Sequence, residues 1–323
     1  MKKALITGIS GQDGAYLAKF LLAKDYKVYG LVRRIVNRDL SNLEYLGIDQ
    51  DIEFVDGDLT DEASLINIIK TLKPDEVYNL AAQSFVGTSW DQPLVTSEIN
   101  AIGTLKLLNA IKTHWPTAKF YQAATSEMFG NSSTNGTQDE NTPFHPRSPY
   151  AISKLFAHWV TVNYKESFGM FAVSGILFNH ESPIRGKEFV TRKITDGVAR
   201  IKLGLAKGIK LGNLDAQRDW GFAGDYVEAM WLMLQQKEAD NFVICTGQTH
   251  SIRELLDVAF KHVGIDDWEK YVSTDPRFKR PAELDILTGK NDKAKKILGW
   301  EPKVNFEELV KMMVDADLKR LKQ

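Results

Sequence analysis

The chain has 323 residues, of which 43% are hydrophobic, and its 41 Lys and Arg side chains nearly balance its 42 Asp and Glu side chains. This length and composition suffice for a full hydrophobic core and favour one large domain or two closely packed ones. The formal net charge of −1 excludes the broad positive surface with which proteins follow nucleic-acid phosphates, so any bound anion must be met locally.

Nothing in the sequence points to secretion, to a membrane or to a structural metal. The apolar run after Lys3 ends quickly at a glycine-rich turn, which is too short for a signal-peptide core, and no window has the length of a membrane-spanning helix. The single cysteine, Cys245, stands in an apolar strand-like run and has no partner for a disulfide within the chain. The six histidines lack the spacing of a zinc site. We therefore expect a soluble cytoplasmic protein.

The first part of the chain alternates short β-rich runs with amphipathic helical patterns, such as the one at 104–112. This alternation is typical of an α/β fold with a Rossmann-type doubly wound parallel sheet. In such sheets, ligands bind beyond the carboxyl ends of the strands. The predicted strands are 3–7, 28–32, 52–55, 76–81, 119–124 and 171–178.

Beyond about residue 180, helical patterns dominate. They predict a smaller, mostly helical lobe that covers the ligand edge of the sheet. We expect a boundary near residue 180, with the sheet domain over 1–180, the second lobe over 181–323, and some crossing of the chain between them. The predicted elements of this lobe are helices at 189–205, 226–236, 251–263 and 306–321 and a short strand at 210–211.

The first predicted strand runs into three spaced glycines, followed by a helix predicted from Ala15. Glycines let the backbone approach a pyrophosphate, and a helix amino terminus offers free N–H groups and a favourable dipole. The glycine spacing alone would fit a plain tight turn equally well, but the order of strand, glycines and helix predicts a dinucleotide site. The predicted contacts in this turn are Gly8, Ser10, Gly11, Gln12, Asp13 and Gly14.

The second predicted strand is followed by Arg33 and Arg34. An NAD site usually carries an acid here for the ribose hydroxyls, whereas arginine suits the 2′-phosphate of NADP. We therefore predict NADP as the cofactor, with Arg33 as its main contact; the alternative is a solvated surface pair. Later strand ends should line the adenine and nicotinamide sides of the crevice through Asp58, Leu59, Leu80, Ala81, Ala82 and Ser84.

Tyr150 and Lys154 follow a proline-rich turn and open a helix predicted to reach about residue 168. Their spacing of four places both on one helix face, and no other tyrosine in the chain has a lysine four residues later. The pair is either a surface pair or a catalytic one. In the catalytic interpretation, the ammonium and a cationic nicotinamide lower the phenol pKa from about 10 toward neutrality, so that Tyr150 acts as a base for a sugar hydroxyl.

Glu127 follows Thr125 and Ser126 at the end of a predicted buried strand. An ionised side chain at such a place costs free energy unless it is paired or used. The structural alternatives are a helix cap or a pair with a surface lysine.

Together these motifs resemble the extended short-chain dehydrogenase/reductase family, and the longer strings are similar to the GDP-mannose 4,6-dehydratases within it. The similarity extends over essentially the whole chain and is more specific than the glycine fingerprint. The strings that carry it are 7–14, 78–84, 178–183, 189–193, 218–221, 280–283 and 298–300.

The resemblance implies an NADP-dependent hydro-lyase that converts GDP-mannose to GDP-4-keto-6-deoxymannose. Oxidation at C4 acidifies the proton on C5, which Glu127 removes while it helps to expel the C6 hydroxyl as water; the hydride then returns to C6. Thr125 would hydrogen-bond O4 beside Tyr150, and Lys154 completes the catalytic set.

The resemblance also implies binding residues and an assembly. His180 and Arg185 join Tyr150 and Lys154 as NADP contacts, and a homotetramer built as a dimer of dimers is expected. The connection after Arg34 is shorter than in many such dehydratases. Phe85 stands where many relatives carry histidine, so it receives no role. The nucleotide-sugar contacts, mostly in the second lobe, would be Ser84, Ser126, Asn179, Val190, Lys193, Arg218, Arg280 and Glu283.

Three other functions fit parts of the pattern. A GDP-heptose 4,6-dehydratase would share every motif named above. An NADP-dependent 4-keto-sugar reductase would have no use for Glu127. A non-catalytic NADP-binding scaffold would require decay of the catalytic residues, of which the sequence shows no sign.

Overall fold

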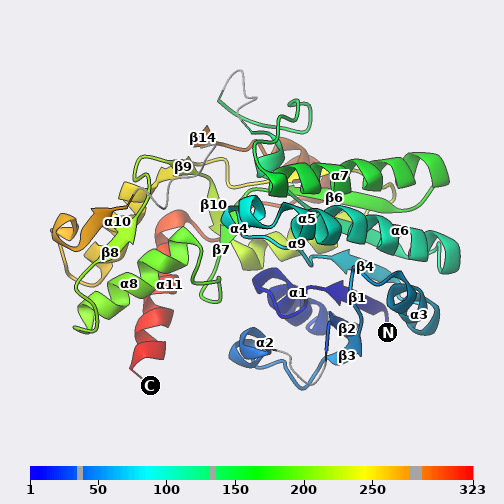
Figure 1. The fold of residues 1–323 in the computed structure, drawn as a ribbon, viewed down its shortest axis with the longest axis horizontal. Coiled ribbons are helices and arrows are strands. Elements are labelled where there is room, and N and C mark those ends of the chain that lie inside the picture. Colours follow the sequence, from blue (N-terminus) through cyan, green and yellow to red (C-terminus); the bar gives the residue numbers. More distant parts are fainter. Residues whose placement is uncertain (35–38, 131–135, 276–285, 323) are drawn as a thin grey trace.

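The structure, a computed structural model, describes residues 1–34, 39–130, 136–275 and 286–322. A seven-stranded sheet of parallel strands lies at its centre (Figure 1). Across the sheet the strands are β3 (Glu53–Asp56), β2 (Lys27–Val32), β1 (Lys3–Thr7), β4 (Glu76–Asn79), β5 (Lys119–Thr125), β6 (Ala172–Leu177) and β11 (Phe242–Ile244). The sheet confirms the predicted Rossmann-type fold. From β1 the chain adds β2 and β3 on one side and β4, β5 and β6 on the other, and ligands of such sheets bind at this point where the strand order reverses.

Helices cover both faces of the sheet, each over its own apolar layer. One layer packs under α1 (Gln12–Leu22) and α9 (Ala223–Gln235). The other packs under α3 (Glu62–Leu72), α6 (Gly103–His114) and α7 (Pro149–Phe168). The shorter elements near the ligand edge are α2 (Ser41–Leu46), α4 (Val86–Asp91), α5 (Pro93–Ser97), the π-helical turn η2 (Glu98–Ile102) and the 3₁₀ turn η3 (Ser126–Met128).

Among the element boundaries that differ from prediction, two lie at the ligand edge of the sheet. Helix α1 begins at Gln12 rather than Ala15, which places Gly14 in its first turn, where a Cβ would lie only 2.2 Å from the Gly8 carbonyl oxygen. Strand β4 ends at Asn79 rather than at residue 81, because the next two backbone N–H groups donate to the Thr7 hydroxyl instead of to a neighbouring strand.

The C-terminal lobe is mostly helical, as predicted, and has its own apolar core. Its helices are α8 (Val190–Lys202), α10 (Ile252–His262), α11 (Phe306–Leu321), η4 (Trp268–Tyr271) and η6 (Ala294–Leu298). Reciprocal capping boxes start α10 and α11, through Ser251 with Glu254 and Asn305 with Glu308. Its small sheets pair β7 (Asn179–Glu181) with β10 (Trp220–Phe222), β8 (Ile209–Leu211) with β13 (Val272–Thr274), and β9 (Gln217–Arg218) with β12 (His250–Ser251) and β14 (Ile286–Leu287).

The chain crosses between the two parts after residue 180. Strand β11 pairs with β6 at the edge of the central sheet, and α9 packs in the same apolar layer as α1. The division near residue 180 into a cofactor domain and a substrate lobe stays a prediction.

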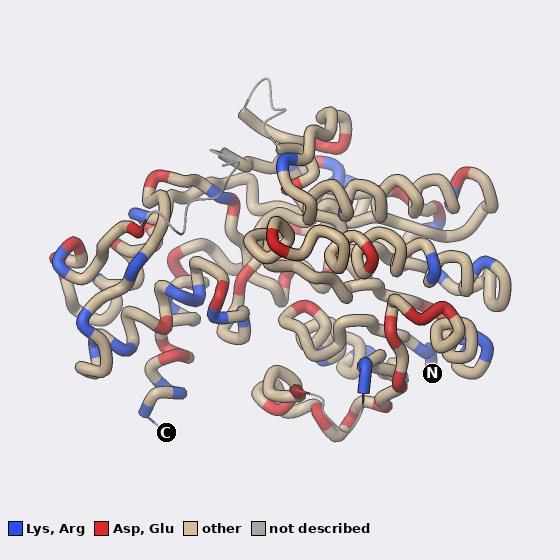
Figure 2. Tube along the Cα trace, viewed as in Figure 1, with Lys and Arg blue, Asp and Glu red and all other residues tan. Residues whose placement is uncertain are grey.

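Charged side chains of both signs are interspersed over the molecule rather than gathered on one face (Figure 2). Within the described ranges, no helix combines the length and the apolar character needed to cross a bilayer.

A buried carboxylate joins the layers at the amino-terminal edge of the sheet. Glu76 is fully buried, and its Oε1 accepts hydrogen bonds from Lys2 Nζ at 3.2 Å, Tyr26 OH at 3.0 Å and Gln235 Nε2 at 3.1 Å. The Tyr78 hydroxyl donates to the other oxygen, Oε2, at 2.7 Å. These donors offset the loss of hydration that burial imposes on the carboxylate.

Tyr78→Phe removes the donor to Glu76 Oε2 without changing the ring. We expect it to lower the free energy of unfolding by about 1–3 kcal/mol, because a buried acceptor loses its partner. Urea denaturation measures the change. The control is Tyr121→Phe, since the Tyr121 hydroxyl is buried and has no hydrogen-bond partner among the described residues. Equal losses in the two variants would contradict a special role for the bond to Glu76.

Candidate active site

A cavity of about 2390 Å³ runs along the carboxyl ends of the strands, between the sheet and the C-terminal lobe. Single drug-sized ligands occupy roughly 300–1,000 Å³, so this cavity has room for a dinucleotide and a nucleotide sugar together. It is lined by every described residue to which the sequence assigned a catalytic or binding role. Two further candidates, Arg280 and Glu283, lie outside the described residues.

The glycine turn at the start of α1 fits a bound pyrophosphate. Gly8 has a φ of +72°, and a Cβ there would lie 2.8 Å from the Ala81 nitrogen, so the turn and the loop after β4 approach as closely as two backbones can. Gly11 precedes α1 in an extended conformation, and no side chain caps the first turn of the helix. The amino terminus of α1 therefore presents backbone N–H groups to the cavity, where an anion can take them.

Polar side chains tie the end of β6 and the start of β7 to this turn. His180 Nε2 lies 2.8 Å from Asp13 Oδ2, and His180 Nδ1 lies 2.7 Å from the carbonyl oxygen of Phe178. Because both neighbours are acceptors, both ring nitrogens must donate, and His180 is an imidazolium. Gln12 adds to the tie, since its Nε2 donates to the His180 carbonyl at 3.0 Å and its Oε1 accepts from Ser182 Oγ at 2.8 Å.

The charges of this pair support each other. Burial, the largest single effect, favours the neutral form of Asp13, but the His180 charge, the hydrogen bonds from His180 and Gln12 and the Arg185 charge together lower the Asp13 pKa to about 2. Burial would also lower the pKa of His180, but the Asp13 carboxylate and the hydrogen bonds raise it overall. The ring of His180 stacks on Tyr226 with centroids 4.7 Å apart.

Arginines from two distant parts of the chain line the cavity. Arg33 and Arg34 are exposed at its rim, just after β2. Arg185 lies at the other side, with its Nε 3.1 Å from Glu181 Oε2 and its guanidinium 3.6 Å from the centre of the Phe189 ring. Phe189 in turn meets Phe85 edge to face.

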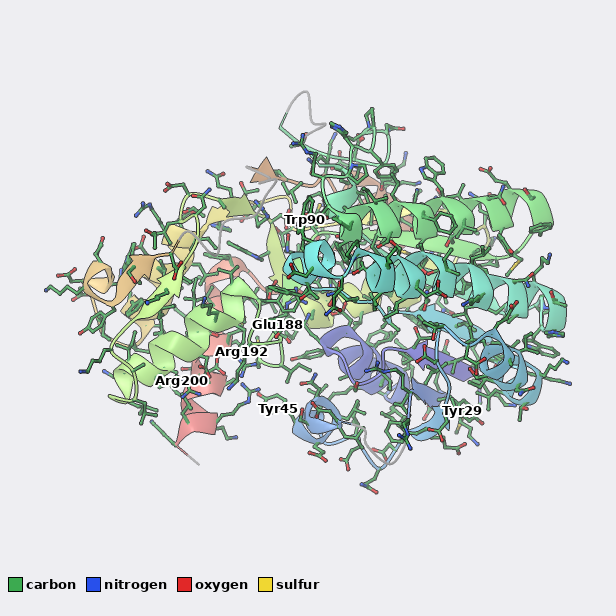
Figure 3. The ribbon with its side chains drawn as sticks, viewed as in Figure 1. Tyr29, Tyr45, Trp90, Glu188, Arg192 and Arg200 are labelled. Carbon is green, nitrogen blue, oxygen red and sulfur yellow. The ribbon has the colours of Figure 1, made fainter. Side chains whose placement is uncertain are left out.

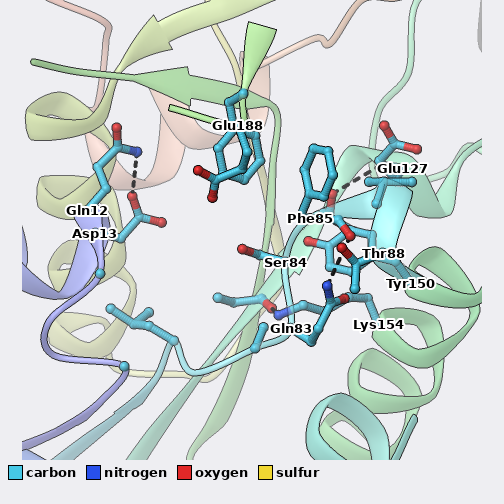
Figure 4. Close-up of a pocket in the computed structure, with 18 of the residues that line it drawn as sticks. Gln12, Asp13, Gln83, Ser84, Phe85, Thr88, Glu127, Tyr150, Lys154 and Glu188 are labelled. Carbon is cyan, nitrogen blue, oxygen red and sulfur yellow. Dashed lines mark hydrogen bonds between the residues drawn. The ribbon is translucent and has the colours of Figure 1, made fainter. Parts of the chain in front are cut away.

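The proposed catalytic residues come from β5 and α7. Thr125, the last residue of β5, caps the short turn η3, and its hydroxyl accepts the Glu127 N–H at 3.3 Å. That turn brings Glu127 to the cavity wall, where it is 8% exposed. Pro149 and the Ser148 cap start α7, whose first turns place Tyr150 and Lys154 beside Thr125. Figure 4 shows Glu127, Tyr150 and Lys154 on one wall, across from Gln12 and Asp13.

Burial is the largest effect on the Tyr150 phenol. Burial raises the pKa of Tyr150 to about 12, although a hydrogen bond with Thr125 acts in the other direction. Burial also lowers the pKa of Lys154 to about 8, and the amine donates to the Ala123 carbonyl at 2.9 Å rather than to the phenol. The protein alone therefore does not lower the phenol pKa, because burial acts against the charged forms of both groups.

On the lobe side, the residues predicted to bind the nucleotide sugar face the same cavity. Asn179 Oδ1 is buried and has no hydrogen-bond partner within the part of the chain that the structure describes, which leaves an acceptor for a ligand donor. Burial lowers the pKa of Lys193, although Asp275 acts in the opposite direction. Arg218 donates through Nη1 to the Gln217 carbonyl at 2.7 Å. Val190 lies at the start of α8, and Ser84 and Ser126 lie at the ends of β4 and β5.

Sequence reasoning missed Asn100, which connects the loop after β4 with the catalytic helix. Its amide exchanges two hydrogen bonds with the Gln83 backbone, at 2.9 and 3.1 Å, and donates to Ser153 Oγ at 3.1 Å. Asn100 lies in the π-helical turn η2, a kind of distortion often found at functional sites. No local sequence pattern predicts a π-helical turn. Phe85 and Glu188, which do line the cavity, were likewise given no role.

Comparison with known proteins agrees with this geometry. A model of the GDP-mannose 4,6 dehydratase family matches residues 5–313. The chain is 55% identical to GDP-mannose 4,6 dehydratase 2 of Arabidopsis thaliana over 332 residues, covering 100% of this chain and 88% of that protein. It is 48% identical to the GDP-mannose 4,6 dehydratase of Homo sapiens over 343 residues, covering 99% and 92%.

Solved structures share the fold over nearly the full length. A UDP-glucose 4-epimerase of Thermus thermophilus in complex with NAD has a TM-score of 0.85 at 27% identity, covering 98% of each chain. RMD of Pseudomonas aeruginosa, complexed with NADPH, has a TM-score of 0.82 at 25% identity and covers 99% of this chain and 100% of its own. With the family model matching almost the whole sequence, the chain belongs to the GDP-mannose 4,6-dehydratase family.

Proposed function

We propose that the chain is a hydro-lyase that converts GDP-mannose into GDP-4-keto-6-deoxymannose with the help of a nicotinamide dinucleotide. The observation that carries this proposal is the position of Glu127, a nearly buried carboxylate beside Thr125 and Tyr150 in the cavity. Loss of water from C5 and C6 needs a base at that place, whereas reduction of a 4-keto sugar does not. Family membership likewise favours GDP-mannose over a GDP-heptose.

The described residues fit a dinucleotide along the sheet edge. The glycine turn and the amino terminus of α1 would hold its pyrophosphate, with His180 and Arg185 as nearby cations. Residues 58–59 and 80–84 would line the adenine and nicotinamide sides. When bound, the nicotinamide supplies a hydride acceptor for C4 and returns the hydride to C6. In this arrangement 1–180 holds most of the cofactor and 181–323 most of the nucleotide sugar.

The side chains of the site then carry out the proton transfers of the reaction. Tyr150 takes the proton of the C4 hydroxyl, with Thr125 hydrogen-bonded to it and Lys154 as the neighbouring cation. Because burial raises the pKa of Tyr150 to about 12, this role requires positive charge from the bound cofactor close to the phenol. Glu127 removes the C5 proton and passes a proton to the departing C6 hydroxyl, so that water leaves. The sugar gains and loses one hydride, and no net oxidation results.

Incubation of the purified enzyme with GDP-mannose in heavy water, without added reductant, tests the reaction. We expect a 4-keto-6-deoxy product that carries solvent deuterium at C5, with no net consumption of reduced cofactor; mass spectrometry and NMR measure both. Stoichiometric oxidation of the reduced cofactor by a 4-keto sugar would instead establish a reductase.

Glu127→Gln should abolish water loss while C4 oxidation continues, because only the second step needs this base. We expect turnover to fall roughly 10²–10⁴-fold, with transient cofactor reduction still visible by stopped-flow absorbance. The control is Glu188→Gln, which removes another carboxylate that lines the cavity and should keep most of the turnover. Undiminished dehydration in Glu127→Gln would remove Glu127 from the mechanism.

We further propose that the cofactor is NADP and that Arg33 binds its 2′-phosphate. The exposed guanidinium at the cavity rim offers a fork of donors to a 2′-phosphate.

Arg33→Ala should raise the Kd for NADP⁺ by about tenfold or more, since a charge-assisted hydrogen bond is lost, and should leave the Kd for NAD⁺ unchanged. Isothermal titration calorimetry compares the two dinucleotides, with Arg34→Ala as the matched control and a smaller expected effect. An equal rise in the Kd for both dinucleotides would argue against recognition of the 2′-phosphate by Arg33.

We also propose a homo-oligomer, up to the dimer of dimers expected from the sequence, and a cytoplasmic location. Large apolar side chains form a stripe on α7: Ile152, Phe156 and Trp159 are 57%, 43% and 54% exposed and recur at helical spacing. Helix α5, which packs against α7, adds Leu94, which is 84% exposed. A continuous exposed apolar face of this kind favours contact with a second copy.

Trp159→Glu should reduce the mass of the particle in solution, because it places a charge on this apolar face. Light scattering after size-exclusion chromatography measures the mass. Phe168→Glu, at the far end of α7, is the control and should leave the assembly intact. A monomeric wild type would contradict the proposal.

A further inference from the structure

A buried ion cluster joins α8, α11 and the loop that follows β7. Arg192 on α8 and Asp317 on α11 are 5% and 1% exposed. Arg192 Nε lies 2.8 Å from Asp317 Oδ1 and 3.0 Å from Oδ2, and its Nη2 lies 2.6 Å from Oδ1. Breaking such a pair leaves an uncompensated buried charge, so the two side chains must stay together. Figure 3 labels Arg192 on the inner part of α8, with Arg200 farther along the same helix.

The remaining donors of this cluster hold the backbone of the loop. Arg192 Nη1 donates to the carbonyl oxygens of Pro183 at 2.8 Å and Arg185 at 2.9 Å. Arg320 Nη1 donates to Asp317 at 3.0 Å, and its Nη2 donates to the same Pro183 carbonyl at 2.7 Å. Two arginines on different helices, joined by one carboxylate, thus fix the course of the chain from 183 to 185.

Arg192 itself does not line the cavity, but Arg185 does. The Arg185 side chain is oriented by an ion pair and a ring contact: its Nε lies 3.1 Å from Glu181 Oε2, without hydrogen-bond geometry to any described residue, and its guanidinium lies over the Phe189 ring. An arginine that is already oriented loses less side-chain freedom when it binds a phosphate. The fixed loop therefore holds the Arg185 guanidinium in one orientation, in the part of the cavity that is proposed to bind the cofactor.

We propose that Arg192, neutralised by Asp317, is a positioning residue that sets Arg185 for the anionic phosphates of the dinucleotide. The inference rests on the proposed function, which places Arg185 at the cofactor. It makes the C-terminal helix α11 a determinant of cofactor affinity, although neither Arg192 nor Asp317 reaches the cavity wall.

A double-mutant cycle separates positioning from plain stabilisation. Arg192→Lys keeps the positive charge opposite Asp317 but loses the planar fork that bonds the two carbonyls. The Kd for NADP⁺ is measured by calorimetry for this change in the wild-type and in the Arg185→Ala backgrounds. We expect about a tenfold loss in the first and less than a twofold loss in the second, because residues that act as a unit are not additive. Equal factors in the two backgrounds, or no change in either, would overturn the inference.

The matched control is Arg200→Lys, the same change on the same helix, in an ion pair with Asp196 that, within the described residues, makes no hydrogen bond to the backbone carbonyls of Pro183 and Arg185. It should leave the Kd for NADP⁺ unchanged. If Arg192→Lys does not fold, Arg320→Gln replaces it in the cycle with the same expected pattern, since it removes the other donor to Pro183. A wild type that binds no NADP⁺ and does not convert GDP-mannose would overturn the proposed function; a binding wild type with equal factors overturns the positioning role alone.

Discussion

The site depends on how two strands part at the switch point of the sheet. The Thr7 hydroxyl donates to Asn79 Oδ1 at 2.7 Å and accepts the N–H groups of Leu80 and Ala81 at 3.1 and 3.0 Å. It thereby satisfies the polar backbone groups that the end of β4 would otherwise leave without partners. The chain can then turn away from the sheet while the Gly8 turn stays in contact with Ala81. That separation opens the edge on which the cavity is built.

Burial is the second constraint, and it explains why the cavity needs its ligands. The protein interior disfavours the charged forms of Tyr150 and Lys154. It therefore raises the pKa of Tyr150 and lowers the pKa of Lys154. In contrast, Asp13 and His180 keep their charges because each faces the other. The Asp13–His180 pair therefore keeps two opposite charges at the glycine turn, whereas burial keeps Tyr150 neutral on the opposite wall of the cavity.

Elements with strong local signals were predictable from the sequence. The strand at 3–7 and the helix at 306–321 needed only the pattern of apolar residues, and the helix that carries Tyr150 needed that pattern and the proline-rich turn before it. The site residues at the strand ends were predictable because the ends of parallel strands meet at one edge, whereas those of the C-terminal lobe followed from the family resemblance; the roles of both remain proposals. What failed depended on contacts between distant segments. The early start of α1, the early end of β4 and the turn that places Asn100 are decided by partners elsewhere in the chain.

The return of the chain to the central sheet has a consequence for how the protein can be divided. Strand β11 covers the outer edge of β6, and α9 covers the same face as α1. A fragment that stops near residue 180 would leave the backbone donors and acceptors of β6 open and one side of the sheet bare, and such edges recruit other chains. The two binding halves are therefore not modules that evolution or an engineer can exchange by a single cut; a graft must carry both segments of the first half, together with the lobe threaded between them.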